Sequence, residues 1–417
     1  MKFEKYNIAT PLIKAILSEG YKKPTDIQFK AIPHILNGED LLAIAQTGTG
    51  KTAAFVIPIL DKIHRKNLKR KSSKLNTIVM VPTRELAVQI CEVFEKFGAK
   101  LKVKSISIFG GVDQDPQINK LIEGVDIIVT TPGRMFDLAS QGYINLSAVD
   151  TLILDEADHM LDLGFRKDIE DLIKYLPKKR QTLFFSATIN DKIKKVAYSL
   201  VNKPVRIQIS PKDPVSKNVD HSVIYIDMDD KRFFLERLVN ENKGKKIMVF
   251  VRTKVRAERV QKAMERVNIN ALVLHGGVEQ LDRLNTLNQF KEDEFDLLIA
   301  TDVSARGIDI PNVAYVVNYD IPDRPEYYIH RVGRTGRGRS KGQAFSFCSQ
   351  DEKPLLKTIQ SYLNKDIKEL RIRKEDQREI IDLTDERKIT MEDIEDQLYQ
   401  KEHGKRKKRN KRNKNKE

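Results

Sequence analysis

The sequence predicts an α/β protein with two parallel-sheet domains, joined by a flexible linker and followed by a basic, disordered C-terminal tail. Three observations support this fold class. The chain has 417 residues, too many for one ordinary hydrophobic core. Apolar segments of strand length alternate with helical segments, a pattern typical of parallel sheets covered by helices on both faces. The alternation lapses once, over the polar residues 208–222, which contain two prolines.

The first domain is expected to cover residues 1–207. Residues 1–40 are predicted to form short amphipathic helices that break at Gly20, Pro24 and Pro33. A helix from Arg84 to Phe97 has apolar side chains at core spacing, and Cys91 beside that stripe is interpreted as a packing residue rather than a reactive thiol. The predicted strands are 41–45, 77–81, 105–109, 126–130, 151–154 and 182–185.

The linker is assigned to residues 208–222 and the second domain to 223–367. This domain repeats the alternation, so we expect the same type of core. Helices are predicted at 254–267, 280–291 and 354–367. The predicted strands are 247–251, 271–274, 297–300, 313–317 and 344–347.

The charge of the chain indicates a polyanionic partner. It carries 75 Lys and Arg against 59 Asp and Glu, a net charge of +16. Residues 368–417 are a charged extension, and its last thirteen residues, 405–417, hold nine Lys or Arg and one Glu. Half of the net charge therefore lies in a tail that we expect to be disordered. A flexible RNA-binding arm and a solubility tail are the two interpretations.

The cysteine and hydropathy patterns indicate where in the cell the protein is expected. The two cysteines lie far apart in the sequence and indicate no disulfide framework or zinc site. The sequence contains no apolar run of membrane-spanning length and no signal-peptide core at its start. The expectation is a cytoplasmic protein without a membrane partner.

A glycine-rich loop follows the first predicted strand. Its glycines allow backbone N–H groups to surround phosphate oxygens, and Lys51 can reach the β- and γ-phosphates. The strict phosphate-loop motif has its first glycine where this chain has Ala45, so a glycine turn with an incidental lysine is the alternative. The loop predicts a site for a nucleoside triphosphate, formed by Thr47, Gly48, Thr49, Gly50, Lys51 and Thr52.

Acidic residues follow the predicted strand 151–154. Carboxylates at the end of a buried parallel strand lie in the crevice where such sheets bind ligands. Asp155 can hold Mg²⁺ together with the Thr52 hydroxyl, and Glu156 can orient and deprotonate the attacking water. The alternative is an acidic cluster that only caps the strand end.

The second domain has no phosphate loop of its own, but it contains interleaved glycines and basic residues from His330 to Arg337. Arg334 and Arg337 could reach a γ-phosphate held by the first domain, as arginine fingers do. Hydrolysis would then depend on closure of the two domains. A basic surface turn is the alternative.

Taken together, these motifs resemble those of DEAD-box RNA helicases of superfamily 2, over about residues 1–350. Residues 20–28 resemble the Q motif, with Asp26 where the family most often has proline, and residues 155–158 spell the family name. The segments 82–86, 110–111, 131–134, 186–188, 249–253, 280–283, 300–309 and 330–337 fill the remaining motifs in order. The compact core with its basic tail looks most like bacterial RhlE-type members.

The resemblance implies two RecA-like domains and a role for each motif residue. Gln28 would read the adenine edge and Tyr21 would stack on it, with Phe3 as the upstream aromatic residue and Asp309 at the ribose. Asp158, Ser186, Thr188 and His330 would couple the ATP and RNA sites. The implied RNA contacts are Pro82, Thr83, Arg84, Gly111, Thr131, Arg134, Arg283 and Thr301.

The implied function is ATP-dependent unwinding of short RNA duplexes, with ATP and Mg²⁺ as cofactors. ATP and RNA would each contact both domains, so each would favour the closed form. RNA contacts to sugar and phosphate imply little sequence preference. We expect a monomer, with ribosomal particles as a candidate partner. A DNA-directed superfamily 2 translocase and an ATP-gated RNA clamp are the alternatives.

Overall fold

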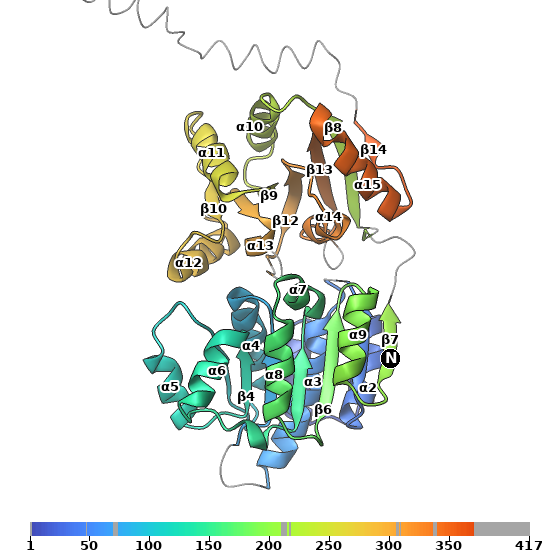
Figure 1. Cartoon of the computed structure of the whole chain (residues 1–417), viewed down its shortest axis with the longest axis vertical. Helices are drawn as coiled ribbons and strands as arrows, with labels where there is room; N and C mark the ends of the chain where they lie inside the picture. Colours follow the sequence, from blue (N-terminus) through green and yellow to red (C-terminus); the bar gives the residue numbers. More distant parts are fainter. Residues whose placement is uncertain are drawn as a thin grey trace, which may run out of the picture.

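The computed structural model describes residues 2–46, 48–69, 74–209, 215–216, 218–305, 308, 310–336 and 340–370. Two α/β domains lie one above the other in Figure 1, with the N-terminal domain in blue to green below and the C-terminal domain in yellow to red above. Each domain contains one seven-stranded parallel sheet. The predicted fold class, two parallel α/β domains, is confirmed.

The sheet of the first domain has the strand order β3-β4-β2-β5-β6-β1-β7. Its five central strands are almost entirely buried apolar segments, as expected for parallel strands covered on both faces. The strands are β1 (Leu41–Ala45), β2 (Thr77–Met80), β3 (Ser105–Ile108), β4 (Ile127–Thr130), β5 (Thr151–Leu154), β6 (Gln181–Ser186) and β7 (Val205–Ile209).

Helices cover both faces of this sheet, and alternate side chains of each strand point to opposite cores. Leu41 and Ala43 pack against α1 to α4, whereas Leu42 and Ile44 pack against α6 to α9. The helices are α1 (Thr10–Ser18), α2 (Asp26–Leu36), α3 (Lys51–Asn67), α4 (Arg84–Gly98), α5 (Asp115–Ile122), α6 (Pro132–Ser140), α7 (Ala157–Asp162), α8 (Arg166–Tyr175) and α9 (Asp191–Leu200), with 3₁₀ turns at Phe3–Lys5 and Leu146–Ala148.

The sheet of the second domain has the order β10-β11-β9-β12-β13-β8-β14. Its strands are β8 (Val219–Tyr225), β9 (Lys246–Val251), β10 (Leu272–Leu274), β11 (Leu297–Thr301), β12 (Val313–Asn318), β13 (Gly342–Cys348) and β14 (Lys368–Glu369). Helices α10 (Lys231–Glu241) and α11 (Lys254–Glu265) cover one face. The other face packs against α12 (Gln280–Lys291), α13 (Asp302–Ala305), α14 (Pro325–Val332) and α15 (Lys353–Leu363), which follows a 3₁₀ turn at Gln350–Glu352.

The structure differs from the sequence prediction at the linker and at one helix. Strands β7, β8 and β14 were not predicted, and β7 and β8 extend into the segment 208–222 that was assigned to the linker. The predicted break at Pro33 is wrong, because Pro33 lies inside α2. The predicted tail, residues 405–417, lies outside the described residues. None of the helices in the described ranges has the length and apolar character that crossing a bilayer requires.

Candidate ATP cleft and RNA groove

The glycine-rich loop connects β1 to α3. Gly48 and Gly50 have φ values of 78° and 93°, a left-handed conformation that side chains with a Cβ rarely adopt. The turn brings Lys51 to the first position of α3, where its Nζ donates a hydrogen bond to the Ala45 carbonyl at 2.8 Å. Thr49 Oγ1 donates to the Gln46 carbonyl at 2.7 Å, and Thr47 lies outside the described residues. This geometry is that of a phosphate-binding loop at a helix N-terminus.

The Q-motif glutamine is tied directly to this loop. Gln28 is buried, its Nε2 donates to the Gly50 carbonyl at 3.1 Å, and its Oε1 accepts from the Thr25 backbone N–H at 3.0 Å. A Cβ on Gly50 would lie 2.5 Å from Gln28 Nε2, so the contact requires glycine. Tyr21 is partly exposed, and its ring meets that of Phe97 edge-on. Phe3, in contrast, is fully buried in the core of the first domain.

Asp155 and Glu156 follow β5 and are both buried. Burial raises the pKa of Asp155 to about 6, against the opposing charge of Lys51. Burial also raises the pKa of Glu156, but the imidazole of His159 and the positive charges of Lys51 and Arg334 outweigh it, so this pKa lies well below its usual range. Of these three residues, Arg334 belongs to the second domain, so charges of both domains act on the Glu156 carboxyl.

The residues at the loop fit a magnesium ion. Mg²⁺ prefers hard oxygen ligands, and the Thr52 hydroxyl and the Asp155 carboxylate are of this type. The raised pKa of Asp155 reflects a buried carboxylate that a bound cation would stabilise.

Contacts between α7 and the end of β6 join the acidic motif to the segment 186–188. Thr188 donates to Asp158 Oδ2 from its hydroxyl at 2.9 Å and from its backbone N–H at 3.1 Å. Ser186 Oγ donates to the Thr188 carbonyl at 2.7 Å. These are three of the four residues predicted to couple the two sites, and the structure brings them together. His330, the fourth, is buried at the end of α14 in the second domain.

The predicted arginine finger Arg334 is held inside the second domain. It is 3% exposed, its Nε donates to the His330 carbonyl at 3.1 Å, and its Nη1 donates to the carbonyl of Ile308. Arg337 and Asp309, predicted for the same site, lie outside the described residues.

A cleft of about 840 Å³ lies between the two domains. The first domain contributes the glycine-rich loop and Thr188, and the second contributes His330, Gly333 and Thr335. Asp26, the departure from the Q-motif pattern, also lines the cleft. A single loop of the first domain thus opens to a cavity whose other wall is the second domain.

A groove of about 370 Å³ also spans the domains. Arg84 passes over Gly111, where a Cβ would lie 2.2 Å from Arg84 Nη1, and Gly111 has a φ of 80°. Arg134 Nη2 donates to the Val112 carbonyl at 3.1 Å, and Thr301 Oγ1 pairs with Ser304 Oγ at 2.8 Å. Six of the predicted RNA contacts line the groove, namely Pro82, Thr83, Arg84, Thr131, Arg134 and Arg283.

A buried hydrogen-bond network closes this groove across the domains. Glu85 Oε1 accepts from Arg283 Nε at 2.8 Å and from Gln280 Nε2 at 3.2 Å, and Arg84 Nη1 donates to Gln280 Oε1 at 3.1 Å. Glu85 is 3% exposed. The roles of Glu85 and Gln280 were missed, because partners 195 residues apart leave no pattern in one sequence. A second cross-domain pair, Arg324 with Asp162 at 3.6 Å, is exposed.

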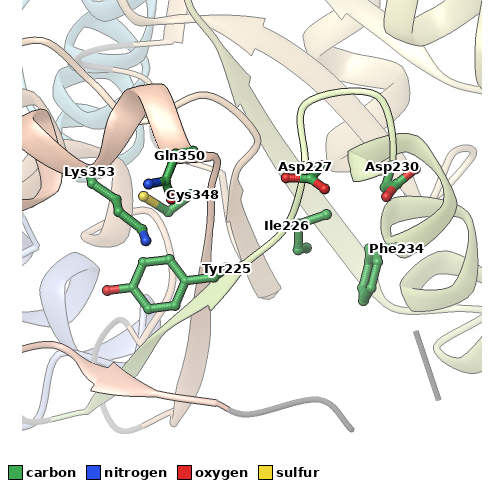
Figure 2. Close-up of a pocket in the computed structure, with 8 residues that line it drawn as sticks. All are labelled: Tyr225, Ile226, Asp227, Asp230, Phe234, Cys348, Gln350 and Lys353. Carbon is green, nitrogen blue, oxygen red and sulfur yellow. The ribbon is translucent and has the colours of Figure 1, made fainter. Parts of the chain in front are cut away.

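The second domain has a separate cavity of about 200 Å³, beyond the ends of β8 and β13. Figure 2 shows Asp227 and Asp230 on one side of it and Lys353 beside the Tyr225 ring on the other. Cys348 lies on the same side as Lys353, and burial raises its pKa to about 11, so its thiol stays protonated near neutral pH. Among the described residues, none of those predicted for a functional site lines this cavity.

The fold and the two interdomain sites define a two-domain nucleoside triphosphatase with one phosphate loop. Comparison with protein families agrees: residues 25–196 match the model described as DEAD/DEAH box helicase, and residues 230–339 match the helicase conserved C-terminal domain. A curated relative, the DEAD-box ATP-dependent RNA helicase CshA of Geobacillus kaustophilus, is 41% identical over 84% of this chain and 74% of its own length. The chain therefore belongs to the DEAD-box ATP-dependent RNA helicases, and it is an RNA-dependent ATPase of this family.

Solved structures of one yeast helicase bear on the domain arrangement. Saccharomyces cerevisiae Dbp5 bound to RNA and ADP BeF3 superposes with a TM-score of 0.80, at 31% identity over 91% of this chain and 99% of that one. A point variant of Dbp5 bound to Nup159, a Gle1 variant, IP6 and ADP gives a TM-score of 0.63, at 30% identity over 91% and 99% of the two chains. The domain arrangement of this chain is thus closer to the first of the two.

Proposed function

We propose that the chain hydrolyses ATP in the interdomain cleft while RNA lies in the interdomain groove, and that both ligands stabilise one closed arrangement. The observation that carries the proposal is that residues of both domains line both sites. Since each ligand would bind the closed form better than an open one, each would promote binding of the other. The likeness to the Dbp5 complex with RNA and ADP BeF3 supports this interpretation.

In this proposal, the first domain holds the nucleotide. Gln28 contacts the adenine and the loop surrounds the phosphates, with Lys51 at the β- and γ-phosphates. Thr52 and Asp155 hold Mg²⁺, which when bound neutralises charge on the phosphate oxygens. Glu156 orients the attacking water and removes its proton, and its lowered pKa keeps it ionised for this task. Tyr21 is assigned to the adenine, and Asp309 of the second domain to the ribose.

The second domain supplies positive charge to the transferred phosphoryl group. Backbone carbonyls of the second domain hold Arg334, and its positive charge lowers the pKa of Glu156 across the domain boundary. This electrostatic reach supports the assignment of Arg334 as a finger. Arg337 is assigned the same role. The hydrogen bonds between Asp158 and Thr188 support a coupling role for the acidic motif and the segment 186–188.

RNA is proposed to contact Arg84, Gly111, Thr131, Arg134 and Thr301 through its sugars and phosphates, with little base readout. Arg283 would exchange its contact with Glu85 for one with RNA, or share it. We propose that short duplexes are opened locally in this groove. RNA would be released when hydrolysis removes the γ-phosphate that bridges the two domains. The basic tail is proposed to be an RNA-binding arm.

We further propose that the two domains comprise residues 1–207 and 223–367. The protein is proposed to be a cytoplasmic monomer that contacts ribosomal particles. The RhlE-type assignment rests only on the compact core and the basic tail, since the curated relative described above carries another name.

The substitution Glu156→Gln tests the proposal. Turnover with saturating RNA should fall by about 10²- to 10⁴-fold, as expected for loss of a general base. Binding of ATP and RNA should persist, and a long-lived complex with both should accumulate. Loss of ATP binding in this variant would contradict the assignment. Equal stimulation of the unmodified protein by RNA and by single-stranded DNA would favour the DNA-directed translocase instead.

A further inference from the structure

Two buried polar atoms lie close together at the start of α7. Glu156 Oε2 and His159 Nδ1 are 3.6 Å apart, and their side chains are 10% and 3% exposed. Within the described part of the chain, neither atom has a hydrogen-bond partner. A buried polar atom without a partner costs about 1–3 kcal/mol, so a hydrogen bond between these two atoms would remove both costs.

The backbone is shaped to bring the two side chains together. Glu156 has a φ of 51° and a ψ of 46°, a left-handed conformation that is uncommon for a residue with a side chain. It directly precedes α7, and His159 lies in the first turn of this helix. Residues three apart at this position face the same side. The neighbouring Asp158 is anchored to Thr188, which fixes the first turn of α7 against the end of β6.

We infer that His159 is a positioning residue for Glu156: its Nδ1–H donates to Oε2 and holds the carboxylate so that Oε1 faces the attacking water. The inference rests on the proposed function, in which Glu156 is the general base. A closing movement of a few tenths of an ångström brings the pair to ordinary hydrogen-bond length. Catalytic hydrogen bonds are often long before the substrates are bound.

In this arrangement the two oxygens of the Glu156 carboxylate have different roles: one is held by His159 and the other acts as the base. Oε2 is buried against the imidazole, which leaves Oε1 as the oxygen that would accept the proton from the attacking water. Without His159, the carboxylate could rotate about its terminal torsion, which is broad for glutamate. Misplacement of a catalytic group by about 1 Å can cost about 100-fold in rate.

Two substitutions of nearly the same shape separate the hydrogen bond from packing. His159→Asn keeps an N–H donor near the place of Nδ1, whereas His159→Leu fills similar space without a donor. With saturating RNA, His159→Leu should lower kcat by about 10- to 100-fold, with KM for ATP and RNA affinity unchanged. His159→Asn should retain most of kcat. The matched control is His64→Leu, since His64 is a buried histidine of the same domain whose Nδ1 accepts from the Lys102 N–H at 3.2 Å.

The outcomes distinguish this inference from the proposed function. If Glu156→Gln loses turnover while His159→Leu keeps full kcat, His159 has no positioning role and the base assignment stands. If Glu156→Gln keeps turnover, the base assignment itself fails. Equal losses of kcat in the Asn and Leu variants, or a loss as large in His64→Leu, would overturn the inference. In the double variant Glu156→Gln/His159→Leu, kcat should fall no further than in Glu156→Gln alone.

Discussion

The two domains share one sheet plan but only the first holds a nucleotide loop. Counted from the first strand of each domain, both sheets have the order 3-4-2-5-6-1-7. In each domain, a loop leads from the first strand to a helix whose first residue is a lysine, Lys51 in α3 and Lys231 in α10. The two lysines therefore occupy equivalent places in the fold.

Their surroundings differ. The loop before Lys51 contains two left-handed glycines, whereas the loop before Lys231 contains no glycine and three aspartates between Ile226 and Lys231. Lys231 is fully buried, and its Nζ donates to the Tyr319 carbonyl at 2.7 Å and to Glu352 Oε2 at 2.5 Å. The cavity beside this loop, shown in Figure 2, has carboxylates where a phosphate would need donors.

The same fold therefore offers an equivalent position in both domains, and the side chains around that position determine whether it can bind a ligand. In the first domain the lysine follows a loop whose residues Gly48 and Thr49 line the interdomain cleft. In the second domain the equivalent lysine is held in an internal ion pair with Glu352, and we propose that this domain contributes arginines to the nucleotide site of its neighbour instead. Three predictions test this division.

The largest expected effect is at Arg334, the second-domain residue that we propose acts on the first-domain site. Arg334→Ala should lower RNA-stimulated turnover on the order of 10³-fold, as for arginine fingers. Nucleotide binding to the full chain should persist, as measured by fluorescence titration with an ATP analogue.

The matched control is Lys353→Ala, a basic residue in the cavity of the second domain. Its turnover should remain unchanged. Full RNA stimulation in Arg334→Ala would refute a cross-domain role for the second domain.

The next effect is on the free energy of unfolding and its dependence on pH, and it depends on Glu352. Burial raises the pKa of this carboxyl, but Lys231 and hydrogen bonds from the Ser349 and Ile321 backbone N–H groups lower it more, so its pKa lies below the usual range. A lowered folded-state pKa contributes stability above the unfolded pKa of about 4.3, and this stability is lost as the pH falls through the folded-state pKa. Glu352→Gln should cost about 3 kcal/mol at pH 7, because it removes the carboxylate that balances the buried charge of Lys231.

Denaturant unfolding at several pH values measures this effect. The difference between the original chain and Glu352→Gln should shrink below about pH 4, as the original carboxyl becomes protonated. Glu170→Gln, which breaks an exposed ion pair with Arg166, should cost less than about 1 kcal/mol. A pH-independent difference for Glu352→Gln would argue against an ionised pair.

A smaller effect is expected where the two domains meet at the groove. Glu85→Ala should raise the RNA concentration needed for half-maximal ATPase stimulation by about 10-fold, since it removes two hydrogen bonds, one of them to a charged arginine. Asp162→Asn breaks the cross-domain pair with Arg324, and it should change this RNA concentration little. Equal effects of the two substitutions would mean that burial of Glu85 does not matter for closure.

Much of the fold was predictable because its central strands are continuous apolar segments. The missed strands β7, β8 and β14 lie at or next to the sheet edge, where exposed and polar residues such as Arg206 and His221 interrupt the pattern. The break predicted at Pro33 was wrong because prolines usually end helices, yet α2 continues around this one.

The candidate sites were predictable wherever consecutive residues form a motif. The loop 48–52 and the acidic residues 155–158 lie at the strand ends where the motifs placed them. The contacts of Glu85 with Gln280 and of His159 with Glu156 were not predictable. The first depends on the packing of two domains, and the second on a left-handed residue at the start of α7.

The stoichiometry of nucleotide binding tests the central claim most directly. Isothermal titration of the full chain with a non-hydrolysable ATP analogue, in the presence of Mg²⁺ and RNA, should give one bound nucleotide per chain. Lys51→Ala should abolish most of this binding, and Lys353→Ala should leave it intact. Two nucleotides per chain, or a site that survives Lys51→Ala and disappears in Lys353→Ala, would contradict the claim that the phosphate loop of the first domain forms the nucleotide site.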